Sequence, residues 1–294
     1  MLTAHVLDAR AATAVGFGAI LLWASLAVLT TMAGPVPPFQ MTAMAFALGF
    51  SLAAVKWIVA REPIGRHLAL PLRVWALGIG GLFGYHACYF AALSLAPPVE
   101  ANLLNYLWPL LIVVFSGLLP GERLRWWHLA GTAAGLVGCV LLVGGGAGGI
   151  ELRYAAGYIA ALAAALTWSS YSVLSRRVRE VPTDAVGAFC GATALLALIA
   201  HLLFEQTYVP QGGEWIAVLV LGLGPVGAAF YLWDYGVKHG DIKSLGALSY
   251  MTPLLSTALL VVFGRAEASL RLALACLLIV GGAVLASREL WGRR

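Results

Sequence analysis

Apolar segments of about 20 residues follow one another along almost the whole 294-residue chain, separated by short polar or Gly-Pro breaks. Because a bilayer's hydrocarbon core is about 30 Å thick and a helix rises about 1.5 Å per residue, each segment is long enough to span a membrane. Backbone polar groups in lipid must be satisfied within the segment, so each span is predicted to be helical. The sequence therefore predicts an all-α polytopic membrane protein.

Ten spans are predicted, and nine of them follow the first, so the first is expected to be a retained helix and not a signal peptide. Turn and charge signals, such as Pro97-Pro98 and Gly240-Asp241, separate them. The predicted spans are residues 12–32, 38–60, 71–93, 98–118, 126–145, 154–175, 184–204, 214–236, 243–264 and 270–287.

The charges are few and unevenly placed. The chain is 61% hydrophobic and 11% charged, whereas a soluble domain is about one quarter charged, so a soluble enzyme is excluded. With ten spans both termini lie on one side, and that side holds 15 of the 18 Lys and Arg residues. The positive-inside rule then predicts cytoplasmic termini in a cell inner membrane, and it explains the net charge of +5 without nucleic acid.

No pattern in the sequence indicates catalysis or a bound cofactor. The four cysteines lie in apolar stretches, so a disulfide framework or metal site is not expected. Neither a Walker A sequence nor the metalloprotease and hydrolase motifs H-E-x-x-H and Gly-x-Ser-x-Gly occur. We therefore predict a protein that is not an enzyme and has no catalytic residues, metal or cofactor.

The chain repeats itself at an offset of 144 residues. Residues 102–111 align with 246–255, the Trp23 segment aligns with the Trp168 segment at nearly the same offset, and Gly78-x-Gly80 aligns with Gly222-x-Gly224. We therefore predict two five-helix halves, residues 1–147 and 148–294. Five is odd, so the second half is inverted in the membrane, a plan that places a transporter's substrate between the halves.

These repeated motifs resemble a known family. Each half has Trp-x-Ser in its first helix and Tyr-x-x-Pro-Leu in its fourth, and Gly121-Glu-Arg-Leu124 closes the fourth helix. This pattern, over about residues 12–288, resembles the drug/metabolite transporter superfamily with paired EamA-type domains, and most of all its YddG-type aromatic amino acid exporters. The second half departs from the pattern at Gly264-Arg265-Ala266-Glu267. The resemblance implies export of aromatic or hydrophobic amino acids by alternating access.

Aromatic and polar side chains well inside the spans are the candidates for a central cavity. Trp23 and Trp168 are repeat mates, so symmetry predicts that they face each other. Aromatic walls suit a flat substrate by stacking and its ammonium group by cation–π attraction; the alternative is packing between helices. The candidate substrate-binding residues are Trp23, Tyr85, Tyr89, Asn102, Tyr106, Trp108, Trp168, Tyr171, Tyr231, Trp233 and Tyr250.

For several other residues the sequence predicts roles outside substrate binding. Pro109 and Pro253 kink their helices, either as hinges or as static bends. Asp234 is expected to reach the cytoplasmic face near Lys238, and His86 to be a hydrogen-bonded structural histidine. Tryptophans beside charges or span ends are expected in the interfacial belt; these are Trp57, Trp75, Trp126, Trp127, Trp215 and Trp291.

Two matters remain open from the sequence. A multidrug or organic-cation exporter of the same superfamily is the alternative function, although residues 11–33 lack the membrane acid that the small cation exporters carry in their first helix. Small residues such as Gly131, Gly135, Gly281 and Gly282 permit close helix packing, either within a monomer or between the subunits of a homodimer. The expected partners are a small-molecule substrate and the lipid bilayer.

Overall fold

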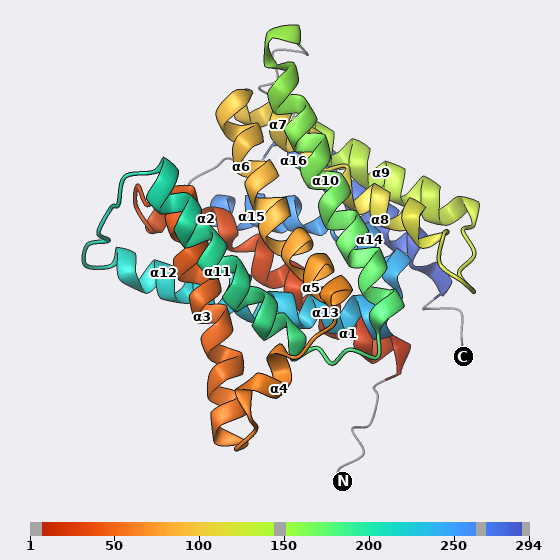
Figure 1. Cartoon of the computed structure of the whole chain (residues 1–294). Helices are drawn as coiled ribbons and strands as arrows, with labels where there is room; N and C mark the ends of the chain where they lie inside the picture. Colours follow the sequence, from red (N-terminus) through yellow and green to blue (C-terminus); the bar gives the residue numbers. More distant parts are fainter. Residues whose placement is uncertain (1–7, 144–150, 263–268, 290–294) are drawn as a thin grey trace.

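The computed structural model describes residues 8–143, 151–262 and 269–289, which form helices and turns without a strand (Figure 1). The predicted boundary between the halves, at residues 147 and 148, lies outside these ranges. The first half contains α1 (Ala9–Ala24), α2 (Leu26–Met32), α3 (Pro38–Val59), α4 (Ile64–Leu68), α5 (Leu72–Ile79), the π-helix η1 (Gly80–Gly84), α6 (Tyr85–Leu95), α7 (Pro98–Asn105), α8 (Trp108–Ser116) and α9 (Trp126–Val143).

The second half repeats this series of helices. It contains the 3₁₀ turns η3 (Leu152–Tyr154) and η4 (Arg176–Val178), the π-helix η5 (Gly224–Ala228), and the helices α10 (Ala155–Ser175), α11 (Ala185–Phe204), α12 (Glu214–Leu223), α13 (Ala229–His239), α14 (Ile242–Leu248), α15 (Met251–Val262) and α16 (Leu270–Ala286).

Helical segments long and apolar enough to cross a membrane number seven among the described residues. Two shorter apolar helices, Trp126–Leu141 and Leu270–Ala286, match the predicted fifth and tenth spans. The predicted ninth span is divided between α14 and α15. The described part of α15 ends at Val262. The prediction of an all-helical, multi-span membrane protein is thus confirmed.

Helices of one half pack on helices of the other in a symmetric pattern. The most extensive contacts join α1 to α13 and α6 to α10, which are equivalent pairs under the predicted repeat. They also join α3 to its mate α11 and α9 to its mate α16, two pairs on opposite flanks of the bundle (Figure 1). The two halves therefore share one core, in which α1, α8, α10 and α13 meet.

Irregular helix turns recur at the repeat offset. The π-helices η1 and η5 begin at Gly80 and Gly224, which are 144 residues apart and belong to the aligned Gly-x-Gly pairs. A π turn leaves backbone groups out of the regular ladder and is frequent at functional sites. The sequence repeat is thus also a repeat of local backbone geometry.

The fourth spans of both halves are broken just before their prolines. α7 ends at Asn105, four residues before Pro109, and α14 ends at Leu248, five residues before Pro253. Proline cannot donate to the carbonyl four residues earlier and clashes with it, so the helix is interrupted there. Each predicted bend thus coincides with an interruption of the helix, and the use of the two prolines as hinges stays a prediction.

The small residues of α9 and α16 are used within the chain. A Cβ on Gly131 would collide with the carbonyl oxygen of Gly282, and one on Gly282 would collide with the carbonyl oxygen of Gly131. Such close backbone approach requires glycine at both positions. The neighbouring Gly281 faces open space, with no atom within 4 Å of a built Cβ. Packing within the monomer therefore accounts for Gly131 and Gly282.

The tryptophans predicted for the interfacial belt divide into two groups. Trp126 and Trp215 are 65% and 43% exposed, as a belt requires. Trp57 is fully buried and stacks on His67 with ring centroids 4.3 Å apart, and Trp127 is buried with the Arg288 guanidinium 3.4 Å from its ring centroid. The belt prediction is wrong for Trp57 and Trp127, and Trp291 lies outside the described residues.

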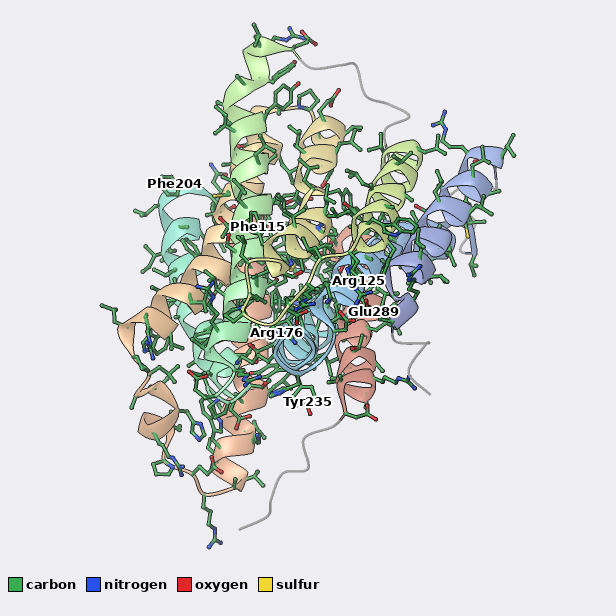
Figure 2. The ribbon with its side chains drawn as sticks, turned by 90° about the vertical axis from the view of Figure 1, so that its right-hand side faces the viewer. Phe115, Arg125, Arg176, Phe204, Tyr235 and Glu289 are labelled. Atoms are coloured by element: carbon green, nitrogen blue, oxygen red, sulfur yellow. The ribbon has the colours of Figure 1, made fainter. Side chains whose placement is uncertain are left out.

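Polar contacts gather at two opposite ends of the bundle. At one end Glu205 accepts hydrogen bonds from the backbone N–H groups of Phe39 and Gln40, 2.9 and 3.0 Å away. Nearby, a hydrogen bond to the Glu214 carboxylate raises the pKa of Tyr208. At the other end lies the ion pair Lys56–Asp184. The ion pair between Arg125 and Glu289, which Figure 2 labels, joins the start of α9 to the residues after α16. The predicted external and cytoplasmic connections thus occupy separate ends.

Candidate functional site

Four tryptophans meet where the two halves join, in an arrangement called here the tryptophan cluster: Trp23 on α1, Trp108 on α8, Trp168 on α10 and Trp233 on α13. The ring centroids of the repeat mates Trp23 and Trp168 are 5.7 Å apart, and those of Trp23 and Trp233 are 5.2 Å apart. Each indole is at most 9% exposed. The predicted meeting of Trp23 and Trp168 is confirmed.

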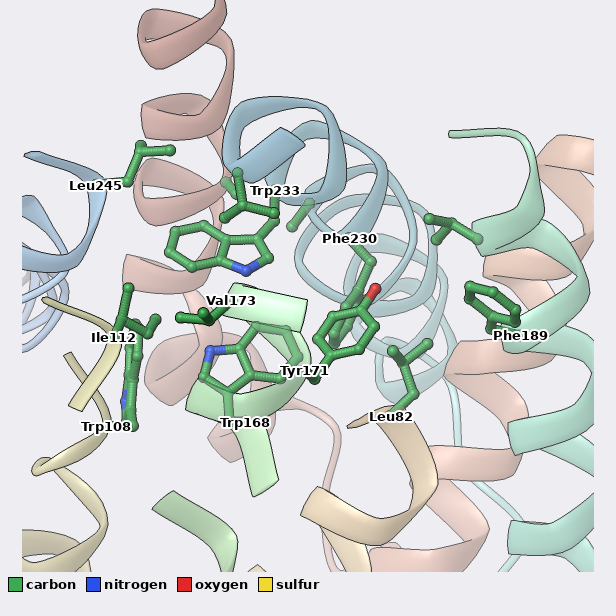
Figure 3. Packing of buried hydrophobic residues seen from close by; sticks show 14 of the residues in the cluster. Leu82, Trp108, Ile112, Trp168, Tyr171, Val173, Phe189, Phe230, Trp233 and Leu245 are labelled. Carbon is green, nitrogen blue, oxygen red and sulfur yellow. The ribbon is translucent and has the colours of Figure 1, made fainter. Parts of the chain in front are cut away.

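Phenylalanine 230 extends the tryptophan cluster, and the sequence reasoning missed it. Its ring lies edge-on to Trp23, with ring centroids 6.0 Å apart. It also lies edge-on to Trp168, with centroids 5.6 Å apart (Figure 3). Because Phe230 and Trp233 are three residues apart on α13, they share a helix face. This i, i+3 spacing was the signal that could have identified Phe230.

The indole N–H groups of the tryptophan cluster differ in their partners. Trp23 donates to the carbonyl of Pro225 at 2.9 Å, within the π-helix η5, and Trp233 donates to the Ser172 hydroxyl at 3.1 Å. For Trp108 and Trp168, no acceptor is found among the residues that the structure describes. These two N–H groups are therefore available to donate to a bound molecule.

A layer of tyrosine and asparagine side chains adjoins the tryptophan cluster. The Tyr85 ring lies 5.6 Å from Trp168 and stacks on Tyr89 at 5.8 Å. The Tyr89 hydroxyl donates to Asn102 at 2.6 Å, and the Asn105 amide donates to the Tyr85 hydroxyl at 3.3 Å. Tyr85, Tyr89 and Asn102 are half-buried, in contrast to the buried indoles. This polar layer joins α6 and α7 beside the tryptophan cluster.

Three candidate residues contribute to packing elsewhere. Tyr250 is fully buried against α9, where a Cβ on Gly135 would lie 2.7 Å from its ring, and its hydroxyl donates to the Tyr106 carbonyl at 3.0 Å. Tyr106 packs against the same group of residues. Tyr231 donates to the carbonyl of Gly49 on α3 at 2.9 Å. These three tyrosines are not brought into the tryptophan cluster.

Tyr171 lies beside the tryptophan cluster and also borders a separate hollow. Its ring centroid is 5.3 Å from that of Trp168. The hollow, of about 480 Å³, lies between α5, η1 and α10 and is lined mainly by apolar residues, together with Arg73. Tyr171 thus connects the tryptophan cluster to a groove between the third and sixth spans.

The ionisable groups near the tryptophan cluster already have partners. Asp234 forms a 2.8 Å ion pair with Lys238 and accepts a hydrogen bond from Thr183 at 2.8 Å. Asp234 lies beside Lys238, but it is 1% exposed, so the expectation that it reaches the surface is wrong. His86 is 2.7 Å from the Leu82 carbonyl, as expected for a structural histidine. The tryptophan cluster itself is uncharged.

Comparison with known proteins agrees with this geometry. The EamA-like transporter family matches twice, at residues 11–144 and 155–288. The chain is 55% identical over 278 residues to the aromatic amino acid exporter YddG of Ancylobacter novellus, covering 94% of this chain and 96% of that protein. It is 27% identical over 218 residues to the Escherichia coli aromatic amino acid exporter YddG, covering 69% of each.

A further relative and a solved structure extend the match. The chain is 27% identical to a probable terminal-alkyne amino-acid exporter of Streptantibioticus cattleyicolor, over 93% of this chain and 95% of that one. A crystal structure with 53% sequence identity superposes with a TM-score of 0.92, covering 96% of this chain and 99% of the other. With two family matches that together span most of its length, the chain belongs to the EamA-like transporter family.

Proposed function

We propose that this protein is a secondary transporter that exports aromatic amino acids across the cell inner membrane by alternating access. The observation that carries the proposal is the tryptophan cluster, in which both inverted halves contribute two indoles at their interface. An uncharged aromatic surface selects flat apolar side chains. The 55% identity to an aromatic amino acid exporter supports the same substrate class.

The proposed architecture has ten spans in two halves, residues 1–147 and 148–294, with both termini in the cytoplasm. The separation of polar contacts into two ends and the 15 Lys and Arg residues predicted for one side support it. Transport then requires the two halves to move against each other, so that the tryptophan cluster is open first to the cytoplasm and then to the outside.

This orientation predicts opposite labelling of two single-cysteine variants. Gly213→Cys, in an exposed turn with no atom within 4 Å of a built Cβ, should react with a membrane-impermeant maleimide added to intact cells. Arg177→Cys, at the other end, should react only after the membrane is opened. Wild-type protein measures the background from its native cysteines. The reverse pattern of labelling would overturn the proposed orientation.

In the proposed site, the substrate ring binds against the tryptophan cluster and the Tyr85–Tyr89 stack, in a central cavity. The free N–H groups of Trp108 and Trp168 are suited to donate to the substrate's carboxylate. The aromatic faces are suited to attract its ammonium group. The proposed site thus offers a partner to the ring, the carboxylate and the ammonium group of an aromatic amino acid. None of these partners is a charged side chain.

Removal of one indole of the tryptophan cluster should weaken transport. Stacking on an aromatic ring contributes about 1 kcal/mol beyond the area that it buries, so Trp168→Ala should raise the apparent KM for tryptophan about fivefold or more. The measurement is initial export rate against substrate concentration, normalised to protein in the membrane. Trp126→Ala, which removes an exposed indole outside the cluster, should leave the KM unchanged.

Transport by purified protein tests the function directly. Liposomes containing the protein and loaded with labelled tryptophan should release it faster than protein-free liposomes, with unlabelled phenylalanine competing and glutamate not competing. A parallel set of liposomes, loaded with labelled choline, tests for transport of an organic cation. Release of choline without release of tryptophan would contradict the proposal and support the alternative function, a multidrug or organic-cation exporter.

A further inference from the structure

A second hollow, called here the charged hollow, lies at the end of the bundle proposed to face the cytoplasm. Its volume is about 440 Å³, within the usual range for small-molecule sites. Five separate parts of the chain meet there: the start of α1, the α8–α9 connection, the η4 turn after α10, the α13–α14 connection with the start of α14, and the residues after α16. Its ionisable lining residues are Asp8, Arg10, Glu122, Arg176, Asp241, Lys243 and Glu289.

One carboxylate in this hollow is held by two cations. The Glu122 carboxylate lies 3.0 Å from the Arg176 guanidinium and 2.8 Å from the Lys243 ammonium, one oxygen to each. Arg176 is fixed in this position because it also donates to the carbonyls of Val237 and Gly240, at 3.2 and 2.7 Å. The two cations are therefore arranged to bind a single carboxylate group.

The two cations belong to helical turns, whereas the Glu122 carboxylate belongs to a connection between helices. Arg176 and Lys243 belong to η4 and α14, whereas Glu122 belongs to the α8–α9 connection, outside any helix. The preceding Gly121 has a φ of 83° and open space around it. Glu122 can therefore leave the two cations through a change in one connection, without moving a helix.

The charge of the hollow restricts what can replace Glu122. The lining has three cationic and four acidic residues, a net charge of −1, which disfavours phosphates and other multiply charged anions. The three remaining acids have other partners: Asp8 accepts a hydrogen bond from the backbone N–H of Ala11 at the start of α1, Asp241 caps α14 through two backbone N–H groups, and Glu289 pairs with Arg125. A molecule with one carboxylate and one ammonium group suits this balance.

We propose that the charged hollow is the cytoplasmic loading site for the substrate amino acid, and that Glu122 occupies the position taken by the substrate's carboxylate. The inference rests on the proposed function, which makes the substrate an aromatic amino acid. Loading exchanges one carboxylate for another on Arg176 and Lys243. The two cations therefore have one carboxylate partner before and after the exchange.

This exchange also releases a link between the halves. Glu122 belongs to the first half, and both of its partners belong to the second. Arg176 follows α10 directly, and Val173 on that helix belongs to the same buried core as Trp168. Displacing Glu122 therefore removes an ion-paired link between the first half and the second.

Thiol protection tests binding in the hollow without measuring transport. Ala9 lines the hollow and is exposed, so an Ala9→Cys variant of the full chain should react with a charged methanethiosulfonate reagent. Tryptophan and indole-3-propionate, which carry a carboxylate, should slow this reaction, and tryptamine, which lacks one, should not. Equal protection by tryptamine, or none by any of the three, would overturn the proposal.

Charge variants test whether the Glu122 carboxylate is the one displaced. Glu122→Gln removes the competing charge, so indole-3-propionate should protect Ala9→Cys at a concentration at least tenfold lower. Asp184→Asn, which alters an acid paired with Lys56 outside the hollow, should leave that concentration unchanged. Lys243→Gln should raise it several-fold. An unchanged concentration in Glu122→Gln, with the variant eluting as folded protein, would refute the exchange.

The two proposals fail in distinguishable ways. If liposomes do not release tryptophan but carboxylates still protect Ala9→Cys in the predicted order, the proposed function fails and the charged hollow remains a carboxylate site. If liposomes release tryptophan and protection is absent, only the loading site fails.

Discussion

Valine at position 282 is expected to prevent stable folding, whereas valine at the adjacent position 281 is expected to be tolerated. A Cβ on Gly282 would collide with the carbonyl oxygen of Gly131 and lie 3.0 Å from the backbone nitrogen of Gly135. Both contacts are with backbone of α9, so relief requires the two helices to separate. Overpacking of a core by side-chain groups alone costs about 1–3 kcal/mol, and a backbone collision should cost at least the upper value.

The adjacent residues make a matched pair because they add the same side chain to the same helix. Gly281→Val points to open space, so it tests the effect of valine on α16 alone. The measurement is the amount of monodisperse protein after detergent extraction and its thermal unfolding temperature. Equal behaviour of the two variants would show that α9 and α16 do not approach as closely as the structure has them.

The plan of the molecule could be predicted from the sequence because it depends on regular signals. Apolar length predicted helices, and an offset of 144 predicted the two halves whose contacts the structure shows. Symmetry then predicted that Trp23 and Trp168 meet, since equivalent points of a two-fold repeat approach each other at its axis. These signals need no knowledge of side-chain orientation.

The choice among aromatic residues could not be predicted in the same way. Tyr106 and Tyr250 are also repeat mates, but their helices turn them toward α9 and α16. The break before each proline sets that rotation, and its angle is not encoded in the spacing of apolar residues. Trp57 lies beside a lysine, as a belt residue does, but the short helix α4 folds back and places His67 on its ring.

The ion pair between Asp234 and Lys238 should contribute more to stability than any exposed pair of the chain. The two side chains are 1% and 3% exposed and 2.8 Å apart. Removing one partner of a buried pair leaves an uncompensated charge and typically costs about 3–5 kcal/mol. Lys238→Met should therefore lower the thermal unfolding temperature strongly and reduce the yield of folded protein.

A double variant distinguishes the loss of the pair from the loss of the lysine's packing. Asp234→Asn with Lys238→Met removes both charges and keeps an acceptor for the Thr183 hydroxyl, so it should recover most of the lost stability. Lys56→Met breaks the ion pair with Asp184, whose side chains are 60% and 28% exposed, and should cost at most about 1 kcal/mol. If Lys238→Met unfolds at the same temperature as wild type, attraction between opposite charges at Asp234 and Lys238 does not stabilise the fold. Asp234 then becomes a group whose charge can change during transport, and Asp234→Asn should be tested for loss of gradient-driven accumulation.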